Sequence, residues 1–169
     1  MNIIGIDPGA RGAIARYVNG RVDAILDMPT TTHKGKLRVN GAALARALRD
    51  LSPALAFLEN VHSMPKQGVA STFAFGRAMG IVEGVLGALS VPFTLITPAE
   101  WKVAMRVPAD KDGARARASQ LIPSCAHHWP LVKHDGRAEA AMIALYGAEH
   151  SNSLAVKQNR RLAALPIEW

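Results

Sequence analysis

Cysteine, aromatic rings and long apolar runs are scarce in this chain of 169 residues. Its one cysteine, Cys125, excludes an internal disulfide and fits a reducing compartment. Aromatic residues make up 5%, so small and aliphatic side chains must build the core. No stretch approaches the ~20 apolar residues of a membrane span, and Asp7 interrupts the first apolar run too early for a signal peptide. We therefore expect a cytoplasmic protein.

Acidic residues are also in short supply. Thirteen Asp and Glu face twenty Lys and Arg, which leaves a net charge of +7 and a pI near 10.1. A basic excess favours polyanionic partners such as nucleic acid, although a solvated basic surface has the same composition. Hydrophobic residues make up 49%, which suits one packed domain. We assign residues 1–150 to that domain and residues 151–169 to a tail or a short added helix.

The first third of the chain predicts an antiparallel meander. Apolar runs at residues 2–6, 12–18 and 21–26 indicate strands, and Asn19-Gly20 between the second and third is a hairpin signal. Residues 30–38 are polar and basic, which predicts a loop.

Helices and strands are expected to alternate in the rest of the chain. Asn40 can cap a helix that ends near residue 51, and Thr97 can cap a second helix. Other helices are expected at residues 70–89, 113–121 and 135–149, and strands at 54–58 and 91–96. Glycines along residues 70–89 would let another backbone approach that helix closely. The pattern predicts an α/β fold with a mixed sheet of five strands, the first three antiparallel, flanked by helices.

Four carboxylates stand at the ends of these elements. Asp7 and Glu59 each follow an apolar strand, so both are expected at carboxyl ends of the sheet, where ligands collect. Asp135 and Glu139 are four residues apart and share one face of the last helix. Taken singly, Asp7 could form an Asx-turn. Asp135 and Glu139 could simply interact with the positive N-terminal end of the last helix.

Gathered together, the four carboxylates would need a cation to offset their repulsion. Hard oxygen ligands select Mg²⁺ or Mn²⁺ over zinc. Two such ions about 3.5–4 Å apart can activate a water and stabilise the leaving oxygen of a phosphodiester. The sequence therefore predicts a metal-dependent nuclease with Asp7, Glu59, Asp135 and Glu139 as metal ligands and catalytic residues.

The segments around these acids resemble the RuvC family of Holliday-junction resolvases, especially its phage and other divergent members. The matching segments are IIGIDPG at residues 3–9, LENV at 58–61, KHDGRAEAAMIA at 133–144, and MPKQG and GRAMG at 64–68 and 76–80. The resemblance implies a ribonuclease H-like fold and a Mg²⁺-dependent crossover junction endodeoxyribonuclease of DNA recombination and repair. It also implies a homodimer that nicks two strands of a four-way junction, in the cytoplasm of a bacterium or a phage-infected cell.

Two features depart from the better-known bacterial enzymes. The bacterial enzymes place the last two acids three residues apart, whereas Asp135 and Glu139 are separated by four. Both spacings keep the two acids on one face of a helix. The bacterial enzymes also carry an aromatic residue three positions after the second acid, where this chain has His62.

Basic residues near the acids are candidates for contacts with DNA phosphates. The resemblance places a lysine near the scissile phosphate, and we assign that role to Lys111, with catalysis. The remaining candidates for nucleic-acid binding are His62, Lys66, Lys102, Arg115, Lys133 and Arg137. His134, next to Asp135, could orient water or support a neighbour.

Other functions fit parts of the pattern. A phosphate-binding ATPase or sugar kinase shares the opening strand-Asp-x-Gly, but such proteins usually need two domains of this kind. A ribonuclease H-like nuclease for other branched DNA or for RNA–DNA hybrids would use the same acids. A non-catalytic junction-binding protein would not need them. The four acids favour the nuclease.

Overall fold

The computed structural model describes residues 1–60, 68–110 and 112–162, with side chains as far as Ser151. Its centre is a five-stranded mixed sheet in the order β3-β2-β1-β6-β7, in which the first three strands are antiparallel and the last three parallel. The strands are β1 (Ile3–Asp7), β2 (Ala13–Val18), β3 (Arg21–Asp27), β6 (Leu55–Glu59) and β7 (Phe93–Ile96). The predicted ribonuclease H-like sheet is confirmed.

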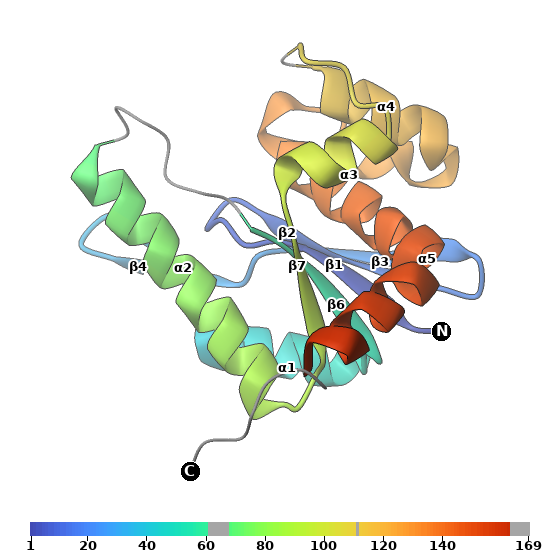
Figure 1. The fold of residues 1–169 in the computed structure, drawn as a ribbon. Helices are drawn as coiled ribbons and strands as arrows, with labels where there is room; N and C mark the ends of the chain where they lie inside the picture. Colours follow the sequence, from blue (N-terminus) through green and yellow to red (C-terminus); the bar gives the residue numbers. More distant parts are fainter. Residues whose placement is uncertain (61–67, 111, 163–169) are drawn as a thin grey trace.

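Helices cover both faces of the sheet, and each face has its own core (Figure 1). On one face lie α1 (Gly41–Leu51) and α2 (Val69–Ala88), and on the other α3 (Pro98–Ala104), α4 (Gly113–Leu121) and α5 (Asp135–Leu162). Two 3-10 turns, η1 (Pro123–His128) and η2 (Val132–His134), connect α4 to α5. Small side chains dominate the face of α5 that meets the sheet, as the low aromatic content requires.

The predicted caps and the first hairpin are confirmed. The Asn40 side chain accepts from the backbone of Ala43, and Thr97 forms a capping box with Glu100. Asn19 and Gly20 have φ of +51° and +81°, the pair of positive angles that a tight hairpin requires.

The loop predicted at residues 30–38 is wrong. Strands β4 (Thr30–His33) and β5 (Lys36–Val39) pair there as a separate two-stranded sheet. Lys34 and Gly35 turn the chain with φ of +48° and +72°, as Asn19 and Gly20 do in the first hairpin. Most of this hairpin is exposed, so its strands lack the apolar alternation from which a half-buried strand is recognised.

Helix α2 differs from its prediction in one respect. By length and composition it could cross a membrane, contrary to our expectation, but its buried residues Ala78, Val82 and Leu86 pack on the sheet. A Cβ atom added at any of its glycines would have open space around it within the described chain, so no backbone of this chain makes the close approach that these glycines would allow. Phe73, on the outer face of this helix, is 72% exposed in this single chain.

The last helix is longer than predicted. Its backbone continues to Leu162, so residues 151–162 extend α5 instead of forming a tail or a separate helix. The boundary predicted near residue 149 rested on the end of the apolar pattern, and a helix can continue beyond its buried face.

Helix α5 lies directly against the central strand. A Cβ atom added at Gly5 would overlap the backbones of Ala140 and Ala144, and one added at Gly147 would overlap the Phe57 ring. Glycine at these positions sets the distance between helix and sheet, and therefore the position of the first turns of α5.

We expect Gly5→Ala to lower the free energy of unfolding by about 3 kcal/mol, because backbone atoms of α5 would have to move. Urea denaturation measures the change. Gly87→Ala is the control, since Gly87 has open space around it and alanine favours a helix; it should stabilise slightly. Equal stability of the two variants would contradict the close packing.

Candidate active site

Three carboxylates converge where α5 begins over the central sheet. Asp7 and Glu59 end β1 and β6, which are parallel neighbours in register. Glu139 lies one turn into α5, and its charge acts on both of them. The first turn of α5 reaches this edge closely, because a Cβ at Gly136 would lie 2.9 Å from Asp7 Oδ2. Strand order and helix position thus bring three of the four predicted acids together, without Asp135.

Asp7 has an environment that penalises its charge. Burial, followed by the charges of Glu139 and Glu59, raises its pKa from 3.8 to about 7. The Gly9 backbone N–H donates to Oδ1 at 3.3 Å and opposes the shift. The Asx-turn and the clustered carboxylate are therefore both present at one residue.

Glu59 is buried, with 4% of its surface exposed. Burial raises its pKa, while a hydrogen bond from Trp101 Nε1 to Oε1 at 2.9 Å opposes the rise. Trp101 is fully buried in α3 and fixes this carboxylate in place. Its role was not predicted, since it lies 42 positions away in sequence; the signal was a tryptophan just after a capped helix start.

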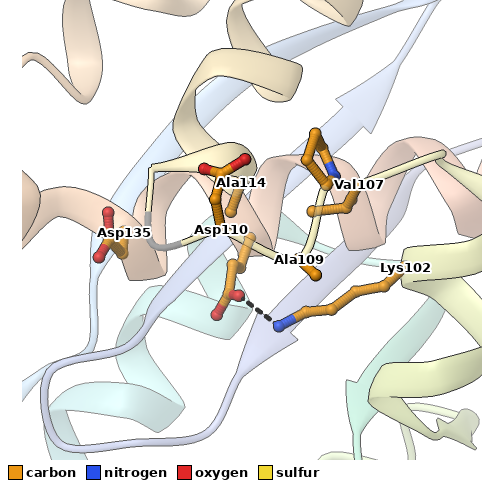
Figure 2. Close-up of a pocket in the computed structure, with 8 residues that line it drawn as sticks. Lys102, Val107, Ala109, Asp110, Ala114 and Asp135 are labelled. Carbon is orange, nitrogen blue, oxygen red and sulfur yellow. Dashed lines mark ion pairs between the residues drawn. The ribbon is translucent and has the colours of Figure 1, made fainter.

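Lys102 pairs with Glu139 inside the site. Its Nζ lies 2.9 Å from Glu139 Oε1 and 5.1 Å from the centre of the Trp101 ring. Burial lowers the Lys102 pKa, but the bond and charge of Glu139, with the charges of Glu59 and Asp7, outweigh it and the net pKa is raised. Figure 2 shows Lys102 reaching across the site to this ion pair.

Asp135 pairs with a different basic residue, Arg115 of α4. Arg115 Nε lies 2.7 Å from its Oδ1 without the alignment of a hydrogen bond, and Arg115 also pairs with Asp112. Asp135 and Glu139 both line a pocket of about 230 Å³ beside α3 and α4 (Figure 2). Asp110, which we did not single out from the sequence, lines the same pocket. Asp135 thus shares a pocket with Glu139 but has its own cationic partner.

The donor set fits a divalent cation, although the acids are not arranged as a finished site. In the described ranges, no three His, Cys, Asp or Glu side chains have the geometry of a metal site. Carboxylate oxygens are the ligands Mg²⁺ prefers, and a cation would remove the repulsion that raises the Asp7 pKa. The ion pairs with Lys102 and Arg115 engage one oxygen each of Glu139 and Asp135, and each carboxylate has a second oxygen to offer a cation.

The other predicted residues are placed as follows. Arg137 binds Asp27 through two hydrogen bonds of 2.6 Å and donates to the His128 carbonyl, so it ties α5 to β3. Lys133 is exposed in η2. His62, Lys66 and Lys111 lie outside the described residues, and their roles stay predictions. The expected contacts of Lys102, Arg115, Lys133 and Arg137 with DNA also stay predictions.

Local contacts account for the positions of His134 and Cys125. The His134 ring accepts from the Leu131 N–H at 3.4 Å and thereby closes η2. Cys125 is buried and directs Sγ toward the Val22 carbonyl, as expected of a packed cysteine.

Comparison with solved structures identifies the fold. No protein-family model matches the sequence, and a search of curated proteins finds no relative. RuvC of T. thermophilus in complex with a Holliday junction substrate aligns with a TM-score of 0.60 and 16% identity, covering 88% of this chain and 96% of its own. The chain has the fold of the RuvC resolvases. Two other structures align with it: the fowlpox virus Holliday junction resolvase (TM-score 0.52, 17% identity, 91% and 99% covered) and the yeast mitochondrial resolvase Ydc2 (0.53, 14%, 84% and 75%).

The raised pKa of Asp7 predicts how the free energy of unfolding depends on pH when no divalent cation is added. Asp7 has a higher pKa in the folded protein than in the unfolded chain. Its contribution to the free energy of unfolding is therefore fully present below about pH 4 and is lost as the pH rises to about 7. Asp7→Asn should therefore stabilise the protein by roughly 2 to 4 kcal/mol at pH 8 and change it little at pH 4. Thermal unfolding in EDTA measures the difference.

Asp23→Asn is the matched control. The Arg16 hydrogen bond lowers the Asp23 pKa, so this change should destabilise slightly above pH 4, with the opposite sign. If the effect of Asp7→Asn were the same at every pH, the charge of Asp7 would not be the cause.

Proposed function

We propose that this protein is a Mg²⁺-dependent, structure-specific DNA endonuclease that resolves four-way junctions by paired nicks. The observation that carries the proposal is the convergence of Asp7, Glu59 and Glu139 at one edge of the central sheet in a RuvC-like fold. The structural neighbours are described as Holliday junction resolvases, which supports the same class of substrate here. The net charge of +7 agrees with a polyanionic substrate.

The four acids would hold two Mg²⁺ ions, with Mn²⁺ able to replace them. Bound there, the ions would supply an activated water and stabilise the leaving oxygen. Asp7, Glu59 and Glu139 are already close, and Asp135 joins them by turning from Arg115. Glu59 is the fixed member, because Trp101 holds one of its oxygens.

Lys102 and Arg115 have a second role in this proposal. Each neutralises one acid in the metal-free protein, at 2.9 Å and 2.7 Å. When cations take over that task, both side chains become available to phosphate oxygens beside the site. The predicted DNA contacts of Lys102 and Arg115 thus belong to the metal-loaded protein.

A non-catalytic junction-binding protein is the second candidate. The observation in its favour is that Glu139 pairs with Lys102 and Asp135 pairs with Arg115, so that basic side chains already neutralise two of the four acids. A ribonuclease H-like nuclease for forks, flaps or hybrids would differ only in substrate. Cutting assays separate the three possibilities.

With Mg²⁺, the protein should nick a synthetic four-way junction and leave linear duplex uncut. Asp7→Asn and Glu139→Gln should each lower the cutting rate at least 100-fold and leave junction binding intact, because both remove ligand charge. Glu149→Gln is the control, an exposed position farther along the same helix. Full cutting by Asp7→Asn would exclude the metal mechanism, and binding without cutting by the wild type would favour the binding protein.

Paired nicking also calls for two active sites, and we propose a homodimer through the outer face of α2. This face leaves Val69 87% exposed and Phe73 72% exposed, next to glycines with open space around them. Such a surface allows close contact between two helices.

Gly80→Glu should raise the dimer dissociation constant at least tenfold, because it introduces a charge into an apolar contact. Sedimentation velocity measures the dimer fraction. Ala42→Glu, on the exposed side of α1, is the control and should leave it unchanged. A wild-type protein that stays monomeric at micromolar concentration would exclude this dimer.

A further inference from the structure

A second cavity lies on the α2 side of the sheet, whereas the pocket lined by Asp135 and Glu139 lies on the α5 side (Figure 1). It has a volume of about 690 Å³ and lies between the β1–β2 turn, the β4–β5 hairpin and the first half of α2. We call it the basic groove and define it by four cations and two apolar side chains. These are Arg11, Lys36, Arg38, Arg77, Leu37 and Phe75.

The charge of the basic groove is of one sign. Its four cations come from three separate elements, and none of the described residues that line it is Asp or Glu. In the described part of the chain, none of the four forms an ion pair with a carboxylate. Lys102, Arg115 and Arg137, in contrast, are all paired with acids.

This difference matters because a phosphate contact needs a cation with free donors. A paired arginine must first give up its carboxylate, whereas Arg11, Lys36, Arg38 and Arg77 have no acidic partner to lose. Within the described residues, the basic groove thus brings four cations without a carboxylate partner together around one cavity. Leu37 and Phe75 add apolar surface on which sugars and bases can pack.

The hairpin that forms one wall is firmly attached. The Asn40 N–H donates to the Pro29 carbonyl at 2.8 Å across its base, and Met28 and Val39 are buried in the core below it. Lys36 and Arg38 lie two residues apart on β5 and therefore project from the same side of the strand. The wall is built into the fold.

The basic groove also leads to the carboxylates. Gly9 lines it, and the Gly9 N–H donates to Asp7 Oδ1. The carbonyl of Arg11 touches the start of α5, because a Cβ at Gly136 would lie 2.8 Å from it. A polyanionic chain lying in the basic groove would therefore run to the Asp7 edge of the candidate active site.

We propose that the basic groove binds the sugar–phosphate backbone of the DNA strand that enters the active site. The β4–β5 hairpin acts as a clamp that holds this strand against α2. This inference rests on the proposed nuclease function but assigns a new surface, one that Lys102 and Arg115 do not line. It predicts strand binding that needs no divalent cation.

The test combines Lys36→Ala and Arg38→Ala in the Asp7→Asn background, so that cutting does not interfere. Binding to a four-way junction is measured by fluorescence anisotropy in EDTA over a range of salt concentrations. We expect the Kd to rise at least tenfold near 0.1 M salt. The slope of log K against log salt should become shallower by about 1.4 to 1.8, the value for two lost phosphate contacts.

The control combines Arg21→Ala and Arg46→Ala, which removes the same charge from exposed positions outside the basic groove. Its Kd should change less than twofold. Equal losses of affinity in the two double variants would reduce the effect to net charge and overturn the proposal. So would an unchanged salt slope in the hairpin variant. Circular dichroism checks the fold, and the single exposed change Lys36→Gln, expected to weaken binding about threefold, repeats the test if the double variant unfolds.

The two proposals fail in different ways. If the wild type cuts junctions and the hairpin variant binds like the wild type, only the basic groove is wrong. If the wild type never cuts but the hairpin variant loses binding, the nuclease proposal fails and the basic groove remains.

Discussion

The contact between α5 and β1 positions the candidate site. Helix and strand approach so closely at Gly5 that no side chain fits between them, and Gly147 does the same over Phe57. Since α5 is anchored on the central strand, its first turn must lie over the end of β1, next to Asp7. Glu139 then falls beside Asp7 and Glu59. A larger residue at either glycine would separate the acids as well as loosen the core.

This packing brings negative charges together at a buried edge, and the chain offsets them in two ways. Asp7 has a pKa of about 7, so it binds a proton easily. Glu139 and Asp135 use Lys102 and Arg115. Both devices reduce the repulsion between these carboxylates.

Much of this arrangement could be predicted from local sequence. Apolar runs give the five strands, Asn19-Gly20 gives the first hairpin, and Asn40 and Thr97 give the two caps. The β4–β5 hairpin could not be recognised, because an exposed two-stranded sheet leaves no apolar alternation. Trp101 could not be assigned to Glu59, because their contact depends on how α3 packs on the sheet. The described backbone shows α5 running to Leu162, beyond the end of its apolar pattern.

The sequence by itself determined which side chains are available: four carboxylates at element ends, a basic excess and a core of small residues. These follow from composition and from periodicities of two and 3.6 residues, which are local. Only the tertiary structure decided which charges face each other. It paired Arg115 with Asp135 and Arg137 with Asp27, and left Arg11, Lys36, Arg38 and Arg77 without acidic partners. Charge pairing depends on distances between elements far apart in the chain, and packing alone sets those distances.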